Sequence, residues 1–211
     1  MNNLTEIIFI IDRSGSMHGL EADTIGGYNS FLKKQQDAEG EAIVTTVLFN
    51  NDMQVIHDRQ DIREVRPLTA ADYIPGGSTA LLDAVGETIR QISRSQSLFR
   101  RTTPNQTVVV IITDGMENSS RRFRWSQVHT MIEEQKEKGW DFVFLGANID
   151  APEMAEKLGV GRAFASNYHA DSLGTFSNYD TLEKTVRKVR CGLKLEEKDL
   201  DDIRRDYRRR R

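Results

Sequence analysis

The segment Asp12-Arg13-Ser14-Gly15-Ser16 carries residues that could hold a small metal ion. It follows the apolar run over residues 7–11, so one carboxylate and two hydroxyls come at alternating positions where a buried strand would reach the surface. Carboxylate and hydroxyl oxygens are hard ligands, which suit Mg²⁺ or Mn²⁺ and no soft metal. The segment contains no obvious catalytic base. It therefore predicts a metal site that serves recognition more than reaction.

Two further oxygen-rich segments stand at positions where they could join the first. Gly76-Gly77-Ser78-Thr79-Ala80 comes just before a long helical stripe, and Thr113-Asp114-Gly115 follows a run of β-branched residues. In a doubly wound sheet, ligands bind beyond the carboxyl ends of the strands, at the point where the strand order reverses. We therefore expect the three segments to converge, with Asp12 and Asp114 facing each other across that point.

The expected metal site would remain incomplete within this chain. Ser14, Ser16 and Thr79 can supply three neutral oxygens. Asp12 and Asp114 can supply negative charge, directly or through water. Mg²⁺ takes about six oxygen ligands and usually keeps some water. A coordination position is therefore left for an Asp or Glu carboxylate of a partner protein.

The elements that must position these residues follow from the hydrophobic pattern. Short apolar runs alternate with longer segments of helical period, which predicts an α/β fold with a Rossmann-like, doubly wound, mostly parallel six-stranded sheet and helices on both faces. Strands are expected over residues 4–11, 42–49, 53–57, 107–112, 142–145 and 162–166. Helical stripes run through residues 25–35, 81–92, 128–135, 152–158 and 179–191. Residues 53–57 follow the strand over 42–49 too closely for a crossover helix between them, so they should form a short antiparallel edge strand. Residues 58–78 are expected to be mostly loop.

Composition and charge exclude several classes. The 211 residues, 38% of them hydrophobic, suffice for one core, and the net charge of −3 creates no general attraction for nucleic acid. No apolar stretch approaches the about 20 residues needed to cross a bilayer. The N-terminal residues lack the pattern of a signal peptide, and Cys191 is the only cysteine. These features favour a cytoplasmic protein without membrane association.

The domain organisation is expected to be simple. Residues 1–190 should form one domain, and residues 191–211 a charged C-terminal extension, helical or frayed. Leu193, Leu200, Ile203 and Tyr207 would share one stripe if the extension is helical. Its end carries a basic cluster made of Arg204, Arg205 and Arg208–Arg211.

Five residues of the three segments match the metal-ion-dependent adhesion site (MIDAS) of the von Willebrand factor type A (VWA) domain family. They are Asp12, Ser14, Ser16, Thr79 and Asp114. The resemblance covers roughly residues 4–190, and the phrases over 76–84 and 144–150 look like those of small stand-alone bacterial members. It implies divalent-metal-dependent binding of protein ligands. In relatives the two serines ligate directly, while the threonine and the third-loop aspartate exchange direct for water-mediated roles.

Other readings of the same residues remain open. The segment after Asp12 could be an ordinary polar turn, and Thr79 could be an N-cap for the following helix. An aspartate after an apolar strand also resembles phosphotransferases that form an aspartyl phosphate. Those enzymes need a general acid two residues further on, where this chain has Ser14, so we expect no enzymatic activity.

The rim of the binding face is expected to come from polar residues next to the three segments. They are His18, Ser78, Glu117, Asn118, Asn148 and Asp150. Two alternative functions differ in the partner. One is an accessory subunit of a chelatase or AAA-type ATPase complex. The other is a nucleic-acid-associated protein that uses the basic cluster, although a short cluster without interleaved aromatic residues argues against it.

Overall fold

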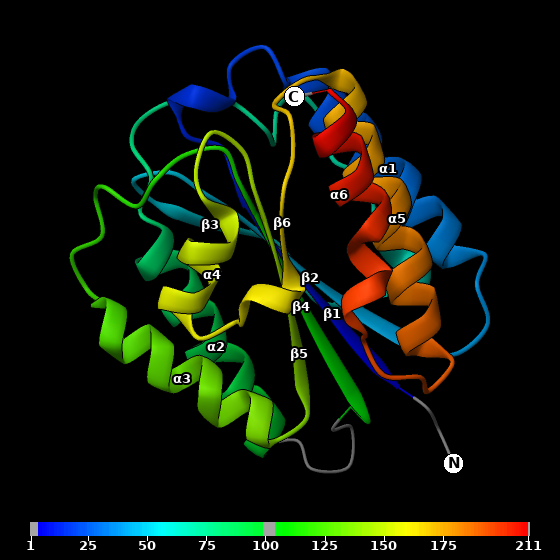
Figure 1. Ribbon diagram of the computed structural model, residues 1–211. Helices are drawn as coiled ribbons and strands as arrows, with labels where there is room; N and C mark the ends of the chain where they lie inside the picture. The colour runs from blue at the N-terminus through cyan, green and yellow to red at the C-terminus, as the bar shows by residue number, and fades with distance from the viewer. Residues whose placement is uncertain (1–3, 99–103, 211) are drawn as a thin grey trace.

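A computed structural model describes residues 4–98 and 104–210, so Arg211 of the basic cluster lies outside the described residues. The strands are β1 (Thr5–Asp12), β2 (Ala42–Phe49), β3 (Met53–Asp61), β4 (Gln106–Thr113), β5 (Trp140–Gly146) and β6 (Ala165–Asn167). They form one six-stranded sheet in the order β3-β2-β1-β4-β5-β6 (Figure 1). Among the described strands, the β2–β3 pair alone is antiparallel. The predicted fold class is therefore confirmed, including the antiparallel edge strand.

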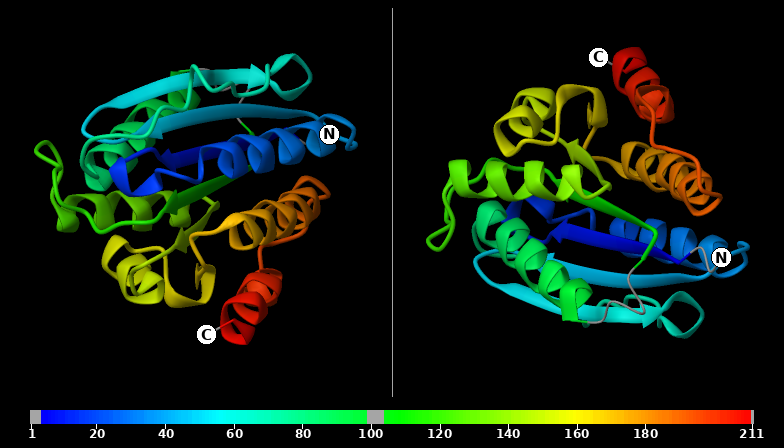
Figure 2. Two further views of the ribbon diagram at one scale, coloured as in Figure 1. Left: turned by 90° about the horizontal axis from the view of Figure 1, so that it is seen from above. Right: turned by 90° about the horizontal axis from the view of Figure 1, so that it is seen from below.

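Helices cover both faces of this sheet (Figure 2). The α-helices are α1 (Glu21–Gln36), α2 (Leu81–Leu98), α3 (Trp125–Glu137), α4 (Ala151–Leu158), α5 (Ser172–Arg190) and α6 (Asp201–Arg209). Short 3₁₀ turns are η1 (Gly15–Met17), η2 (Ile62–Glu64), η4 (Arg162–Phe164) and η5 (Glu197–Leu200). Within the described ranges, no helix has the length and apolar character that a membrane span requires.

The central strand β1 is buried on both faces because successive side chains of a strand point to opposite sides. Ile7, Phe9 and Ile11 belong to the core beneath α1 and α5. Ile8 and Ile10 belong to the core beneath α2, α3 and α4. A strand with two apolar faces must lie in the middle of the sheet, so its polar end emerges at the middle of one edge.

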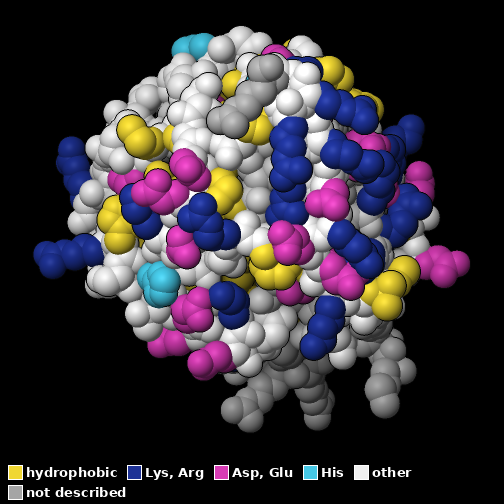
Figure 3. Space-filling model, in the orientation of Figure 1, with side chains coloured by type: hydrophobic (Ala, Val, Ile, Leu, Met, Phe, Trp, Pro, Cys, Tyr) yellow, Lys and Arg dark blue, Asp and Glu magenta, His cyan; other side chains and the backbone are white. Residues whose placement is uncertain are grey.

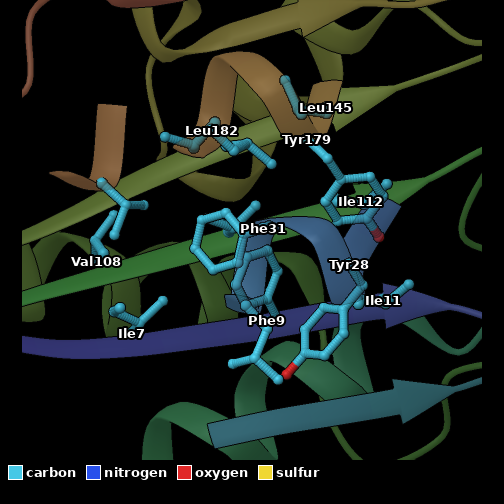
Figure 4. Packing of buried hydrophobic residues seen from close by; sticks show 14 of the residues in the cluster. Ile7, Phe9, Ile11, Tyr28, Phe31, Val108, Ile112, Leu145, Tyr179 and Leu182 are labelled. Carbon is cyan, nitrogen blue, oxygen red and sulfur yellow. The ribbon is translucent and has the colours of Figure 1, made fainter. Parts of the chain in front are cut away.

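The core beneath α1 and α5 combines aliphatic side chains with a group of aromatic rings (Figure 4). The ring of Phe9 lies edge-on to Tyr28 and Phe31, with ring centroids 5.4 and 4.9 Å apart. The two helices also approach each other closely, since a Cβ placed on Gly27 of α1 would lie 2.2 Å from Cδ2 of Tyr179 on α5. A glycine is therefore required at this crossing.

Several element boundaries differ from the predicted ones. Strand β3 continues to Asp61 rather than ending at residue 57, so the expected loop starts later. Helix α5 begins at Ser172, earlier than predicted, because the Asp171 carboxylate accepts the Gly174 N–H and caps it. The edge strand β6 covers Ala165–Asn167, and the residues before it form the turn η4.

The C-terminal segment packs on the domain. Leu200 and Ile203 are buried in the same core as α1 and α5, and the ring of Tyr207 lies 4.7 Å from that of His169. Leu193 is 55% exposed, so it does not belong to the buried stripe that the helical pattern predicted. Its backbone lies in the connection between α5 and η5, outside both helices. The helix α6 brings the C-terminal end of the described chain close to the start of α5 (Figure 1).

Candidate metal centre

The sheet carries the first and third segments to neighbouring places on its carboxyl-end edge. Strands β1 and β4 pair in parallel, with Ile11 opposite Ile112, so Asp12 comes beside Thr113. This is the point where the strand order reverses, because β2 lies on one side of β1 and β4 on the other. The topology thus places Asp12 and Asp114 together, as the sequence predicted.

A chain of polar contacts runs from Asp12 to Asp114. The Ser14 N–H donates to Oδ1 of Asp12 at 2.7 Å, and the Ser14 and Ser16 hydroxyls lie 3.1 Å apart. The Ser16 hydroxyl then donates to Oδ1 of Asp114 at 2.5 Å. The two carboxylates and two hydroxyls therefore face one small volume at the edge of the sheet.

Thr79 joins this group from the second segment. A Cβ placed on Gly115 would lie 3.4 Å from the Thr79 hydroxyl oxygen and 3.5 Å from that of Ser16. The two oxygens therefore approach the backbone just after Asp114. Thr79 itself is 3% exposed, so its hydroxyl lies inside the edge rather than on a flexible rim.

The N-cap reading of Thr79 is not what the contacts show. The Leu82 N–H at the start of α2 donates to Oε2 of Glu117 at 2.9 Å, and the Asp83 N–H donates to the Ser120 hydroxyl at 3.0 Å. Two of the amides that a helix start leaves free are thus taken by the third loop. This leaves the Thr79 hydroxyl outside the cap.

Two of the expected rim residues hold the loops together. Asn118 accepts the Thr79 N–H at 2.9 Å and returns its own N–H to the Thr79 carbonyl at 3.0 Å. Glu117 also accepts the N–H groups of Ser119 and Ser120, besides that of Leu82. Both residues therefore fix the third loop on the second segment and on α2.

The other expected rim residues have different surroundings. His18 is exposed and lies 3.3 Å from Glu21. Asn148 has a left-handed backbone conformation, with a φ of 57°, and its side-chain amide lies 3.5 Å from the Asp114 carbonyl. Asp150 accepts the Glu153 N–H and so caps α4. The Ser78 N–H donates to Asn51.

A hollow of about 520 Å³ opens beside the centre. Ser16 and Asp114 form part of its lining, together with His18 and Asn148, whereas Asp150 does not line it. Its far side is made by Asp23 of α1 and by residues 170–172 before and at the start of α5. The hollow exposes the edge of the centre to solvent.

The electrostatics of the centre fit a cation. Asp12 is fully buried and Asp114 is 2% exposed. Burial raises the pKa of both carboxyls, and hydrogen bonds from hydroxyl and amide groups oppose this rise. Within residues 4–98 and 104–210, no lysine or arginine pairs with either carboxylate. All converging side-chain atoms are oxygens, which is the donor set of a hard divalent ion.

Neutral oxygens are essential to this donor set. In the part of the chain that the structure describes, no three His, Cys, Asp or Glu residues gather as a metal cluster. A divalent ion would be held by two carboxylates and three hydroxyls from three separate loops. The residues present therefore fit Mg²⁺ or Mn²⁺ better than a metal that requires thiolate or imidazole ligands.

Sequence reasoning missed two residues that touch Asp12. The Thr113 hydroxyl donates to Oδ2 of Asp12 at 2.6 Å, and the Tyr73 hydroxyl donates to the Asp12 carbonyl at 2.6 Å. Thr113 could have been found, since the predicted register of the two strands places it beside Asp12. Tyr73 gave no signal, because it lies in a segment that reads as loop.

Comparisons with known proteins agree with this fold. The sequence matches the model of the von Willebrand factor type A domain over residues 6–187. Among curated proteins, the comparison finds no match. Many solved structures are similar, and three of them illustrate the range.

The vWF domain of the type V pili tip protein Mfa5 from Porphyromonas gingivalis has a TM-score of 0.62 and 11% identity, over 92% of this chain and 97% of that one. Proximal thread matrix protein 1 from the mussel byssus, with a zinc-occupied MIDAS motif, has a TM-score of 0.56 and 18% identity, over 89% of this chain and 46% of that one. Manganese-loaded TRAP protein from Plasmodium vivax has a TM-score of 0.54 and 14% identity, over 84% and 74%.

The chain spans about half the length of the mussel proteins that it matches. At these identities the solved structures show similarity of fold alone. The family model, in contrast, covers most of the sequence, from the start of β1 to the last turn of α5. This chain belongs to the von Willebrand factor type A domain family.

Proposed function

We propose that this chain is a non-catalytic, metal-dependent protein-binding module. Ser14, Ser16, Thr79, Asp12 and Asp114 would hold Mg²⁺ or Mn²⁺, and a partner Asp or Glu would complete the coordination shell. When bound, the ion supplies a Lewis-acid position that attracts a carboxylate. The single observation that carries the proposal is the chain of polar contacts from Asp12 through Ser14 and Ser16 to Asp114, which brings two carboxylates and two hydroxyls together.

The exposure of the ligand residues supports binding from outside. Asp12, Ser14 and Asp114 are buried, whereas Ser16 is exposed and borders the hollow. A partner carboxylate can therefore approach from the side of Ser16. The two carboxylates would formally neutralise the charge of a divalent ion. Together with the three hydroxyls they would fill five of about six octahedral positions, which leaves about one position for the partner.

The surroundings of the centre support recognition rather than catalysis. The position where an aspartyl-phosphate enzyme would carry its general acid is Ser14, whose hydroxyl lies beside that of Ser16. His18 is the nearest histidine in sequence, and it is exposed and paired with Glu21. Zinc and manganese are named for two structurally similar proteins, and a divalent ion at this centre is our proposal for the present chain.

The arginine-rich end supports a structural role over nucleic-acid binding. Arg204 donates to the carbonyl of Ala163, and Arg205 pairs with Asp202. Arg210 pairs with Asp171 at the start of α5. Figure 3 shows Lys and Arg side chains gathered over α5 and α6 with a few Asp and Glu among them. If the partner is an ATPase, as in the accessory-subunit alternative, it would be bound through the same metal-dependent contact.

Calorimetric titration with MnCl₂ and MgCl₂ tests the metal. The unaltered chain should bind one equivalent, and Asp114→Ala should abolish binding because it removes half of the negative charge. Asp52→Ala is the matched control, since Asp52 is an exposed acid in the β2–β3 connection on the same edge. No uptake of either ion by the unaltered chain would contradict the proposal.

A displayed library of random peptides then tests the carboxylate. Peptides selected in MgCl₂ should contain Asp or Glu, should be released by EDTA, and should lose binding when that acid is replaced by Asn or Gln. Asp114→Ala should capture none of them, while Asp52→Ala should capture them normally. Selection of peptides whose binding survives EDTA would refute metal-dependent recognition.

A further inference from the structure

Asp12 is the residue at which all three loops of the centre are tied together. Its side chain accepts from Ser14 in its own loop and from Thr113 in the third. Its carbonyl accepts from Tyr73, which precedes the second segment. The relative placement of the three loops therefore depends on what holds this one residue.

Thr113 links the first loop to the third through its side chain. Its hydroxyl oxygen lies 2.6 Å from Oδ2 of Asp12 and 3.1 Å from the carbonyl of Gly115, and it accepts the Gly115 N–H at 3.3 Å. A hydroxyl carries one proton, and the shorter contact is to a carboxylate, which forms the stronger hydrogen bond. The proton therefore goes to Asp12, while the oxygen restrains the backbone directly after Asp114.

Tyr73 links the first loop to the second through the main chain. It is 1% exposed, and its hydroxyl donates at 2.6 Å to the last carbonyl of β1. The segment that follows is fastened to the same loop, since the Gly76 N–H donates to the Arg13 carbonyl and the Gly15 N–H donates to the Gly77 carbonyl. Tyr73 thus ties the start of the loop that carries Thr79 to the end of β1.

We propose that Thr113 and Tyr73 are positioning residues of the metal centre, which act through Asp12 on the spacing of the three loops. The inference rests on the proposed function, because it assigns these residues to the same centre. Hydroxyl ligands from separate loops are weak individually, so they bind a small ion only where the loops are held at the correct spacing. Groups that orient metal ligands from outside typically change metal affinity by about 10–100-fold when removed.

Titration of free Mn²⁺ by electron paramagnetic resonance tests the proposal with Tyr73→Phe and Thr113→Val. Each variant removes one hydroxyl and keeps the size of the side chain. Both should raise the Kd for Mn²⁺ by about 10–100-fold. Thr113→Ser, which restores the hydroxyl, should return the affinity to within about threefold of the unaltered chain, a recovery that a packing role would not give.

Two controls remove equally buried hydroxyls that contact each other and not Asp12. The Tyr28 hydroxyl contacts the Thr46 hydroxyl at 2.6 Å, between α1 and β2. Tyr28→Phe and Thr46→Val should leave the Kd for Mn²⁺ unchanged, although they lower the melting temperature in EDTA as much as the two test variants do. Where Thr113→Val does not fold, Thr113→Ala replaces it.

The outcomes are distinguishable. Full Mn²⁺ affinity in both Tyr73→Phe and Thr113→Val would overturn this inference alone and leave the proposed function standing. An equal loss of affinity in the Tyr28 and Thr46 controls would also overturn it, because the effect would then follow stability. A failure of the unaltered chain to bind Mn²⁺ would overturn the proposed function and this inference together.

Discussion

Replacing Gly27 by alanine tests the close approach of α1 and α5. A Cβ at this position would lie 2.2 Å from Cδ2 and 2.9 Å from Cε2 of Tyr179. The Tyr179 ring is 3% exposed and belongs to the core beneath α1, so it has little room to move away. Gly26 is the matched control, because a Cβ there would meet no atom within 4 Å.

The expected magnitudes have opposite signs. Alanine is favoured over glycine in a helix interior by about 1 kcal/mol, which should stabilise Gly26→Ala by that amount. Overpacking of a core costs typically about 1–3 kcal/mol, and a contact of this length places Gly27→Ala at the upper end. The net loss for Gly27→Ala is then about 2 kcal/mol. For a chain of this size, Tm should fall by about 4–8 °C in Gly27→Ala and rise by about 2–4 °C in Gly26→Ala.

Urea and thermal unfolding followed by far-UV circular dichroism measure both variants. Adding Tyr179→Leu to Gly27→Ala should cost less than the sum of the two single changes, because the clashing ring is gone. A Gly27→Ala chain that is as stable as the unaltered one would refute the reasoning, since the two helices could not then approach as closely as described.

Three further perturbations have definite expected results. Mg²⁺ at about 100 times its Kd should raise the free energy of unfolding by about 2.7 kcal/mol, and Asp114→Ala should remove that gain in thermal melts with MgCl₂ and EDTA. Glu117→Ala should cost about 1–2 kcal/mol in urea unfolding, because it uncaps α2, and an unchanged midpoint would show that the cap is dispensable. The Arg66 guanidinium, together with hydrogen bonds from Thr69, lowers the pKa of Asp72 far below its ordinary value of 3.8. The stabilisation from ionised Asp72 is therefore complete above the ordinary pKa and is lost as the pH falls below it towards the folded-state pKa, so Asp72→Asn should reduce the loss of stability in acid titrations below about pH 4.

Much of the fold follows from the sequence because the central strands are buried on both faces. Their continuous β-branched and aromatic runs identify them without knowledge of their neighbours, as for β2, whose predicted and observed boundaries coincide. The start of α5 was missed because Leu173 and Phe176 are exposed, so its first turns lack an apolar stripe. The end of β3 was missed because edge strands carry polar residues on their open side, which resemble loop residues.

The candidate site also contains residues that the sequence predicts and contacts that it does not. The five proposed ligands could be found because each follows a strand or precedes a helix, and parallel topology brings those ends together. The contact from Tyr73 to Asp12 could not be found, since it depends on how a long connection folds back beneath the edge. Nor could the capping of α2 by Glu117, which requires the third loop to cross the helix start.

The pairing of Arg210 with Asp171 has a practical consequence for how the chain is handled. It brings the C-terminal end of the described chain next to residues that border the hollow, whereas Thr5 starts β1 at the opposite end of the sheet (Figure 1). An affinity tag, fluorophore or fused domain attached behind Arg210 would crowd the approach to the metal centre. Immobilisation through the amino end leaves that approach unobstructed.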